Sequence, residues 1–166
     1  SAQSLLRNST LSALILDTLA YWTSDGEICV GVPVAFPAEN GELKNDASFV
    51  AVRYTRHGGE LAQRAMAFQE ALLGSLDHLA FSGVDIARAL GQQSQGNPTL
   101  PVILTNCLSW ETLKADAPMR YVNGLTTTPQ IAIDLRLMLD EEKNLLLRVD
   151  YVEEVLASDQ IEAMLA

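Results

Sequence analysis

The feature that most restricts the fold of this chain is a pair of segments near its C-terminal end in which apolar and polar side chains alternate. The first reads QIAIDLRLML, the second reads NLLLRVDY, and the run DEEK separates them. A period of two is the pattern of a strand with one buried face, so we expect a β-hairpin over residues 130–151. A slip of one residue would turn a whole arm over, so only registers that keep like faces together are allowed.

Charged side chains on the polar face distinguish the remaining registers. One register sets Asp134 opposite Asp150. It also sets Arg136 opposite Arg148, so that like charges face each other twice. The other register sets Asp134 opposite Arg148, and we expect it because like charges directly opposite destabilise a strand pair. An ion pair of this kind contributes about 0–1 kcal/mol and would give Asp134 a purely structural role.

The rest of the chain predicts a mixture of helices and strands. A helix is expected over residues 9–22 because apolar residues recur at steps of three and four, on the stripe Leu11, Leu14, Ile15, Thr18, Leu19 and Trp22. Further helices are expected from residue 61, from the capping box at Ser82 and over 159–165, and further strands over 27–36, 48–55 and 102–105. Without a strict βαβ alternation, this order predicts an α+β fold with a mixed sheet covered by helices on one face.

The strand expected over residues 27–36 has an unusual composition. Large side chains alternate in it with small ones, including Gly31. The small side predicts that another element approaches this strand closely. Pro33 cannot donate to a ladder, so the strand should be irregular or at an edge at that point.

Length, charge and cysteines limit the classes of function. The chain has 166 residues, 48% of them hydrophobic, which suits a single domain over residues 1–166. Its formal net charge of −10 makes nucleic acid and anionic membranes poor partners. No apolar run approaches about 18 residues, so a soluble, cytoplasmic protein is expected. Cys29 and Cys107 show no zinc-ligand spacing, so we expect small buried residues and no metal site.

Motifs along the chain resemble those of one protein family. They are PVILTN at 101–106, TTTPQIAID at 126–134, LLLRVDYVEEVL at 145–156 and DHLAFSGVDIARAL at 77–90. In order and spacing they resemble the C-terminal lobe of condensation-type domains of nonribosomal peptide synthetases, in particular the heterocyclization subfamily. The core T-P-Q-x-x-x-D, from Thr128 to Asp134, is the specific part. The chain departs from the family pattern at Asn106, Thr127 and Val149, where Ser, Gln and Trp are usual.

The resemblance implies a chloramphenicol-acetyltransferase-like lobe that pairs with an N-terminal lobe, whose D-x-x-x-x-D-x-x-S motif this sequence does not contain. In such domains an acyl donor and Cys, Ser or Thr, each carried on the phosphopantetheine of a carrier protein, are condensed in a channel between the lobes. The product then loses water to give a thiazoline or oxazoline, and no cofactor within the lobe itself is implied. The resemblance places the family's dehydration pair on Thr105 and Asp134.

One carboxylate can serve such a cyclisation as base and then as acid, and a threonine hydroxyl can orient it. Asn106, Thr128 and Gln130 are the candidates for substrate contacts. Gln130 and Thr128 have a structural alternative, since both belong to the bend around Pro129.

Other functions remain open at the level of sequence. The chain could be half of an amide- or ester-forming acyltransferase in which Asp134 only pairs with Arg148. It could also be a lobe without catalytic function that serves as an interaction surface, which the substitutions at Asn106, Thr127 and Val149 keep in consideration.

Overall fold

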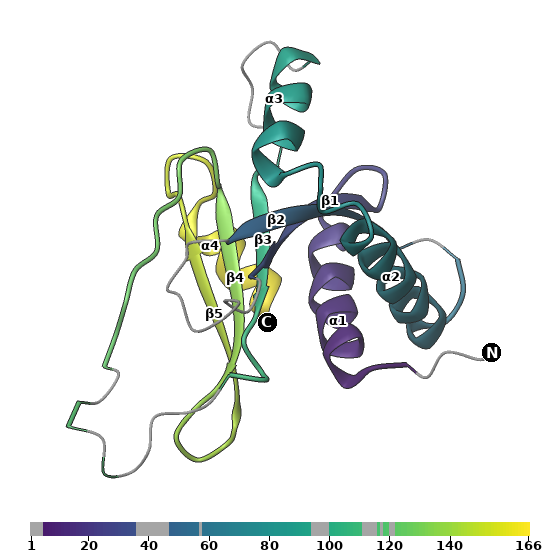
Figure 1. Cartoon of the computed structure of the whole chain (residues 1–166). Coiled ribbons are helices and arrows are strands. Elements are labelled where there is room, and N and C mark those ends of the chain that lie inside the picture. The colour runs from purple at the N-terminus through teal and green to yellow at the C-terminus, as the bar shows by residue number, and fades with distance from the viewer. Residues whose placement is uncertain are drawn as a thin grey trace.

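The computed structural model describes residues 5–35, 47–56, 58–93, 100–110, 116, 118–119 and 122–166. In chain order the elements are α1 (Arg7–Tyr21), β1 (Glu27–Val34), β2 (Ser48–Thr55), α2 (Leu61–Leu76), α3 (Gly83–Gln93), β3 (Val102–Asn106), β4 (Ile133–Leu139), β5 (Leu145–Tyr151) and α4 (Ser158–Leu165). The strands form one five-stranded sheet in the order β2-β1-β3-β4-β5 (Figure 1). β3 runs parallel to both β1 and β4, and the other pairs are antiparallel. The expected α+β fold with a mixed sheet is confirmed.

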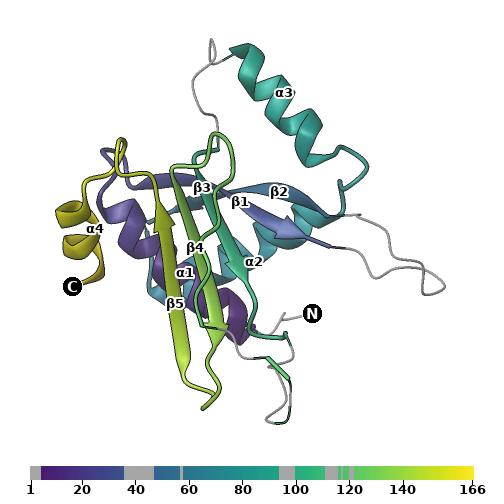
Figure 2. The ribbon, with the colours of Figure 1, turned by 90° about the vertical axis from the view of Figure 1, so that its left-hand side faces the viewer.

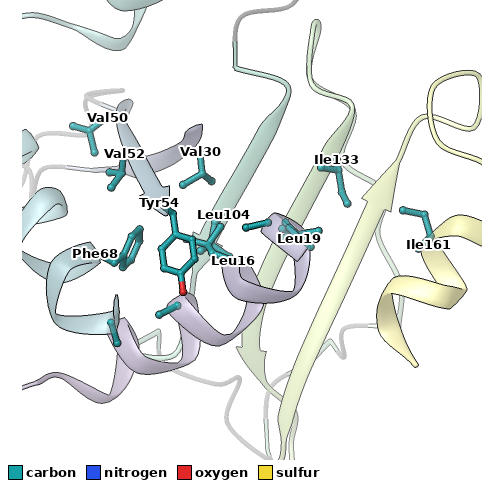
Figure 3. Packing of buried hydrophobic residues seen from close by; sticks show 14 residues of the cluster. Leu16, Leu19, Val30, Val50, Val52, Tyr54, Phe68, Leu104, Ile133 and Ile161 are labelled. Atoms are coloured by element: carbon teal, nitrogen blue, oxygen red, sulfur yellow. The ribbon is translucent and has the colours of Figure 1, made fainter. Parts of the chain in front are cut away.

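Helices cover one face of this sheet. α1 and α2 pack against it and against each other, and α3 contacts β2 and projects beyond the sheet (Figures 1 and 2). Leu16 of α1 and Phe68 of α2 meet Val52 and Leu104 of the sheet in a single apolar core, to which α4 adds Ile161 (Figure 3). We call the opposite face the outer face. In Figure 2 the outer face of β3, β4 and β5 is turned toward the viewer, and α1 and α2 lie behind these strands.

The buried side of α1 differs from the predicted stripe. Leu14 is 51% exposed and Trp22 is 47% exposed, although both were expected to be buried. The side chains that are buried are mostly small, namely Ser9, Ser12, Ala13, Leu16, Leu19 and Ala20. Small side chains let α1 approach α2 and the sheet closely, so the helix is rotated relative to the position that apolar periodicity alone predicts.

The expected close approach on β1 is confirmed at Gly31. A Cβ at this position would lie 2.5 Å from Cδ1 of Ile103 on β3. Gly31 pairs with Ile103, and the ladder between these strands does not extend to Pro33. The strand is therefore edge-like on its β3 side at Pro33, as the missing N–H requires.

The hairpin register was predicted wrongly. Asp134 lies opposite Asp150, and Arg136 lies opposite Arg148. The loop explains this register, because the Asp140 carboxylate accepts hydrogen bonds from the backbone N–H groups of residues 142 and 144, at 2.9 and 2.8 Å. With Lys143 at a φ of 68°, this loop closes between Leu139 and Leu145 and sets every later pair.

A polar cluster holds α1, α2 and β2 together beside the core. Arg64 on α2 donates two hydrogen bonds to the carboxylate of Asp17 on α1, from Nε to Oδ1 at 3.0 Å and from Nη2 to Oδ2 at 2.7 Å. Tyr54 on β2 donates its hydroxyl to the same carboxylate at 2.9 Å. Burial and the hydrogen bond to Asp17 raise the pKa of Tyr54 to about 12. This cluster fixes the helices relative to the sheet because a bidentate pair tolerates little rotation.

Replacing Asp17 by Asn is expected to lower the free energy of unfolding by about 1–3 kcal/mol, because the variant weakens charge-assisted hydrogen bonds at a half-buried site. Urea denaturation of the 166-residue chain measures the change. The matched control is Glu27→Gln, which removes the same charge from the exposed pair of Glu27 with Arg53 and should cost less than about 1 kcal/mol. Equal losses in the two variants would contradict the role of Asp17.

Candidate functional site

Polar side chains collect on the outer face of β3, β4 and β5. Because side chains alternate along a strand, Thr105, Asp134, Arg136, Arg148 and Asp150 share this face, opposite the core residues of the same strands. One row of the sheet runs from Thr105 through Arg136 to Arg148. The neighbouring row runs from Ile103 through Asp134 to Asp150. The sheet thus places the charged residues of the hairpin beside the hydroxyl-bearing strand β3.

Opposite charges in this cluster meet along the strands and across the diagonal. Nη2 of Arg136 lies 3.4 Å from Oδ2 of Asp134 and 3.7 Å from Oδ2 of Asp150. Nε of Arg148 lies 3.4 Å from Oδ1 of Asp150. The like charges that face each other across the hairpin are therefore interleaved with opposite ones. This arrangement offsets the repulsion that made the observed register appear unfavourable from sequence.

Asp134 is the one residue of the cluster that is buried as a whole, with 8% of its surface exposed, and the side chains of Asp134 and Asp150 are about equally buried, at 11% and 10% exposed. Its Oδ2 faces Arg136, whereas its buried Oδ1 has no hydrogen-bond partner within the described part of the chain. Burial raises the pKa of the Asp134 carboxyl above its ordinary value, and the charge of Asp150 adds to this effect. Arg136 acts in the opposite direction through its charge and its hydrogen bond. A buried carboxylate with a raised pKa and an unsatisfied oxygen is typical of acid–base sites.

The segment before β4 lies over the cluster. Nη2 of Arg136 donates to Oγ1 of Thr126 at 2.6 Å, and the backbone N–H of Thr126 donates to Asp150 at 3.4 Å. Arg148 donates to the side-chain oxygen of Asn123 at 2.8 Å. The T-T-T run is thereby tied to the charges of the hairpin, so the position of this segment depends on them.

A small hollow lies between the T-T-T run and the hairpin. It is lined by Thr126, Thr127, Thr128, Ile131, Ala132, Asp134, Asp150, Tyr151 and Val152. It has room of about 40 Å³. A single water needs roughly 10–15 Å³ by such a measure, so the hollow suits water and is too small for an aminoacyl group. A substrate would therefore have to approach Asp134 from the outer face.

The structure brings some of the predicted site residues together and separates others. Thr105 is half-buried on the strand next to Asp134, displaced by two residues on the same face, and Thr128 lines the hollow with Asp134. Asn106 falls on the opposite face by alternation, and its side chain accepts the N–H of Leu108 at 3.2 Å. Gln130 is exposed with a φ of 68°, in the turn closed by the bond from residue 131 to residue 128.

Arg136 and Asp150 were not among the predicted site residues. In the sequence they mattered only as charges that discriminate between hairpin registers. Their involvement follows from the register itself, which sets Asp150 beside Asp134 and lets Arg136 reach both carboxylates. The signal available in the sequence was the spacing of two between Asp134 and Arg136, which places both on one face of a strand.

The cysteines differ from each other. Cys107 is buried as expected, and burial raises the pKa of its thiol. Cys29 was expected to be buried but is exposed, because it lies on the outer face of β1, away from the helices. Within the described ranges, no cluster of three or more His, Cys, Asp or Glu side chains is arranged to hold a metal ion. No helix among these residues is both long enough and apolar enough to cross a membrane.

One known protein resembles this chain in sequence, and several resemble it in fold. Pyochelin synthetase PchF of Pseudomonas aeruginosa is 29% identical over 133 residues, which cover 74% of this chain and 7% of PchF. No protein-family model matches the chain.

Two solved structures resemble the chain over nearly its whole length. The nonribosomal peptide synthetase FmoA3 superposes with a TM-score of 0.79 and 21% identity, covering 95% of this chain and 18% of that one. The cyclization-docking bidomain of the synthetase EpoB from Sorangium cellulosum gives 0.77 and 22%, covering 97% and 34%. The chain therefore has the chloramphenicol-acetyltransferase-like lobe fold found within these synthetases, and it spans a small part of each.

The burial of Asp134 predicts how stability depends on pH. Because its folded pKa is raised, the folded chain binds this proton more tightly than the unfolded chain does. The contribution of Asp134 to stability is then fully present below its ordinary pKa and is lost as the pH rises through the folded value. The free energy of unfolding of the wild type, relative to Asp134→Asn, should therefore fall as the pH rises above about 4 in urea titrations.

Asp140 provides a control of opposite sign. Hydrogen bonds from Asn144 hold the pKa of the Asp140 carboxyl below its ordinary value. Its stabilising contribution is present above the ordinary pKa and is lost as the pH falls, so the difference between wild type and Asp140→Asn should rise with pH. Two curves of the same sign would contradict the assignment of the Asp134 shift to burial.

Proposed function

We propose that this chain is the C-terminal lobe of a heterocyclization domain in a nonribosomal peptide synthetase, and that Asp134 and Thr105 act in its cyclodehydration step. The observation that carries the proposal is the buried Asp134 carboxylate, whose Oδ1 lacks a hydrogen-bond partner and which lies next to the strand of Thr105. Asp134 stands in the T-P-Q-x-x-x-D motif that suggested this function. The fold shared with the EpoB cyclization-docking bidomain supports the proposal.

The reaction requires a group that first accepts and then donates a proton. Cyclisation begins when the thiol or hydroxyl of the acceptor residue attacks the newly formed amide carbonyl. Asp134 takes the proton from that sulfur or oxygen and passes it to the carbonyl oxygen, which becomes the hydroxyl of a tetrahedral intermediate as the C=O π bond breaks. Asp134 then takes the N–H proton and passes it to this hydroxyl, which leaves as water while the nitrogen lone pair forms the C=N bond. The net change is loss of one water.

The environment of Asp134 suits this cycle. A raised pKa favours the protonated form of the carboxyl, the form that acts as an acid. Thr105 has one donor and two acceptor sites, which suit it to hold the developing hydroxyl or alkoxide from the neighbouring strand. Both groups belong to the outer face, where the segment that carries Thr126 lies beside them.

The size of the hollow indicates what else the reaction needs. Room of about 40 Å³ cannot enclose two acyl chains, which supports a second lobe that completes the channel over the outer face. We infer that the partners are the N-terminal lobe of the same domain and carrier proteins that present both substrates on phosphopantetheine. The net charge of −10 is compatible with these partners if the other lobe provides the contacts to the negatively charged phosphopantetheine arm.

Replacing Asp134 by Asn in the intact two-lobed protein is expected to reduce ring formation by about 10²–10⁴-fold while the linear amide still forms. The assay uses Cys, Ser and Thr each loaded on the acceptor carrier protein, with mass spectrometry to distinguish linear product from product that has lost one water. The control, Glu141→Gln, removes a carboxylate from the exposed hairpin tip and should leave both products unchanged. Ring formation by Asp134→Asn at the wild-type rate would refute the proposal.

Replacing Thr105 by Val removes the hydroxyl but keeps a branched side chain on β3. Ring formation is expected to fall by on the order of 10²-fold, as for loss of one polar contact to a developing charge. Thr105→Ser should recover most of the activity because it restores the hydroxyl. If Val and Ser variants form rings equally well, Thr105 has no part in the step.

The alternative of an amide- or ester-forming half-domain had assigned Asp134 to a structural pair with Arg148. The ion pair of Asp134 is formed with Arg136 instead, and its other oxygen lacks a partner. That pairing does not satisfy the carboxylate, so it does not by itself explain why an aspartate occupies this position. Equal loss of amide and ring in Asp134→Asn would favour the alternative.

A further inference from the structure

We propose that Arg136 is the positioning residue of Asp134, holding Oδ2 so that the carboxylate keeps a single orientation. This inference rests on the proposed function of Asp134. The guanidinium contacts both Oδ2 of Asp134 and Oγ1 of Thr126, so it joins the proposed acid–base residue to the motif segment that lies over it.

The two oxygens of Asp134 have different surroundings. Arg136 lies 3.4 Å from Oδ2, whereas Oδ1 is buried without a hydrogen-bond partner within the described ranges. Rotation by half a turn about the last side-chain bond would exchange the oxygens if neither were held. A donor on one side fixes the plane of the carboxylate, so its two oxygens keep distinct positions.

Arg136 is itself held in place. Its strongest contact is with Thr126, at 2.6 Å, and a second carboxylate, that of Asp150, lies 3.7 Å from the same nitrogen. The side chain is 20% exposed. An arginine with a hydroxyl and two carboxylates around one nitrogen has little freedom to leave Asp134, so the orientation it imposes should persist during the reaction.

A purely structural role for this pair is less consistent with its geometry. A structural pair at a buried position would be expected to satisfy both carboxylate oxygens, because an unsatisfied buried oxygen costs free energy. Here the arginine lies on one side only. Arg136 also counteracts the effect of burial on the pKa of Asp134, so it keeps the proton exchangeable as well as orienting the carboxylate.

Arg148 offers a matched comparison within the same cluster. It lies directly across the hairpin from Arg136 on the same face, and its side chain is similarly buried. Arg148 interacts with Asp150 and Asn123, and it is not among the charges that shift the pKa of Asp134. Removing either arginine changes the net charge equally, but the ion pair observed with the proposed acid–base residue is formed by Arg136.

The test measures ring formation against pH in the intact two-lobed protein, with acyl donor and cysteinyl carrier protein as the probe. Arg136→Met should lower kcat by about 10–10²-fold with little change in KM, since orientation of the carboxylate is lost. The acidic limb of the plot of kcat against pH should move to higher pH, because the variant removes the interaction that lowers the pKa of Asp134. Arg136→Lys should recover the position of this limb more fully than it recovers kcat. Arg148→Met should leave the limb at its wild-type pH.

A second variant keeps the proposal testable if Arg136→Met does not fold. Thr126 is exposed, so Thr126→Val should fold while removing the hydroxyl that anchors Arg136. It should lower kcat in the same direction, by a smaller factor, and Thr126→Ser should restore it. Unchanged kcat and pH dependence in both Arg136→Met and Thr126→Val, with Asp134→Asn inactive in ring formation, would overturn this inference alone. An active Asp134→Asn would overturn the proposed function on which it rests.

Discussion

Asp134 lies directly opposite Asp150 in the hairpin. Arg136 and Arg148, in the next row of the sheet, offset the repulsion between the two carboxylates. The Asp140 loop closes the hairpin in this register, and alternation then carries the charges to the outer face and the apolar residues to the core. The proximity of Asp150 to Asp134 and the contact of Arg136 with both carboxylates depend on this one pairing. A shift of the register by two residues would move Asp150 away from Asp134.

The two faces of the sheet place different demands on the sequence. The inner face carries the stability of the fold, through an apolar core that α1 reaches with small side chains and that the Asp17–Arg64 pair borders. The outer face carries a carboxylate whose burial is unfavourable and which the core must offset. Because the outer-face side chains point away from the core, a substitution such as Thr105→Val should leave the core intact.

The likeness to peptide synthetases concerns a lobe and not a whole enzyme. The chain spans 7% of PchF and 34% of the EpoB bidomain, and its hollow has room of about 40 Å³. The chemistry proposed for Asp134 therefore depends on what covers the outer face. The charges that hold the motif segment in place lie on that same face.

Sequence by itself determined the order of helices and strands, the mixed α+β class, the close approach at Gly31 and the alternation that puts Asp134 and Arg136 on one face. These are local properties, set by periodicity and by the backbone limits of glycine and proline. Only the tertiary structure decided the hairpin register, the buried side of α1, the positions of Asn106 and Gln130 away from the cluster, and the burial of Asp134. Pairwise charge rules failed at the register because hydrogen bonds in the Asp140 loop and diagonal ion pairs outweigh the repulsion between directly opposed residues.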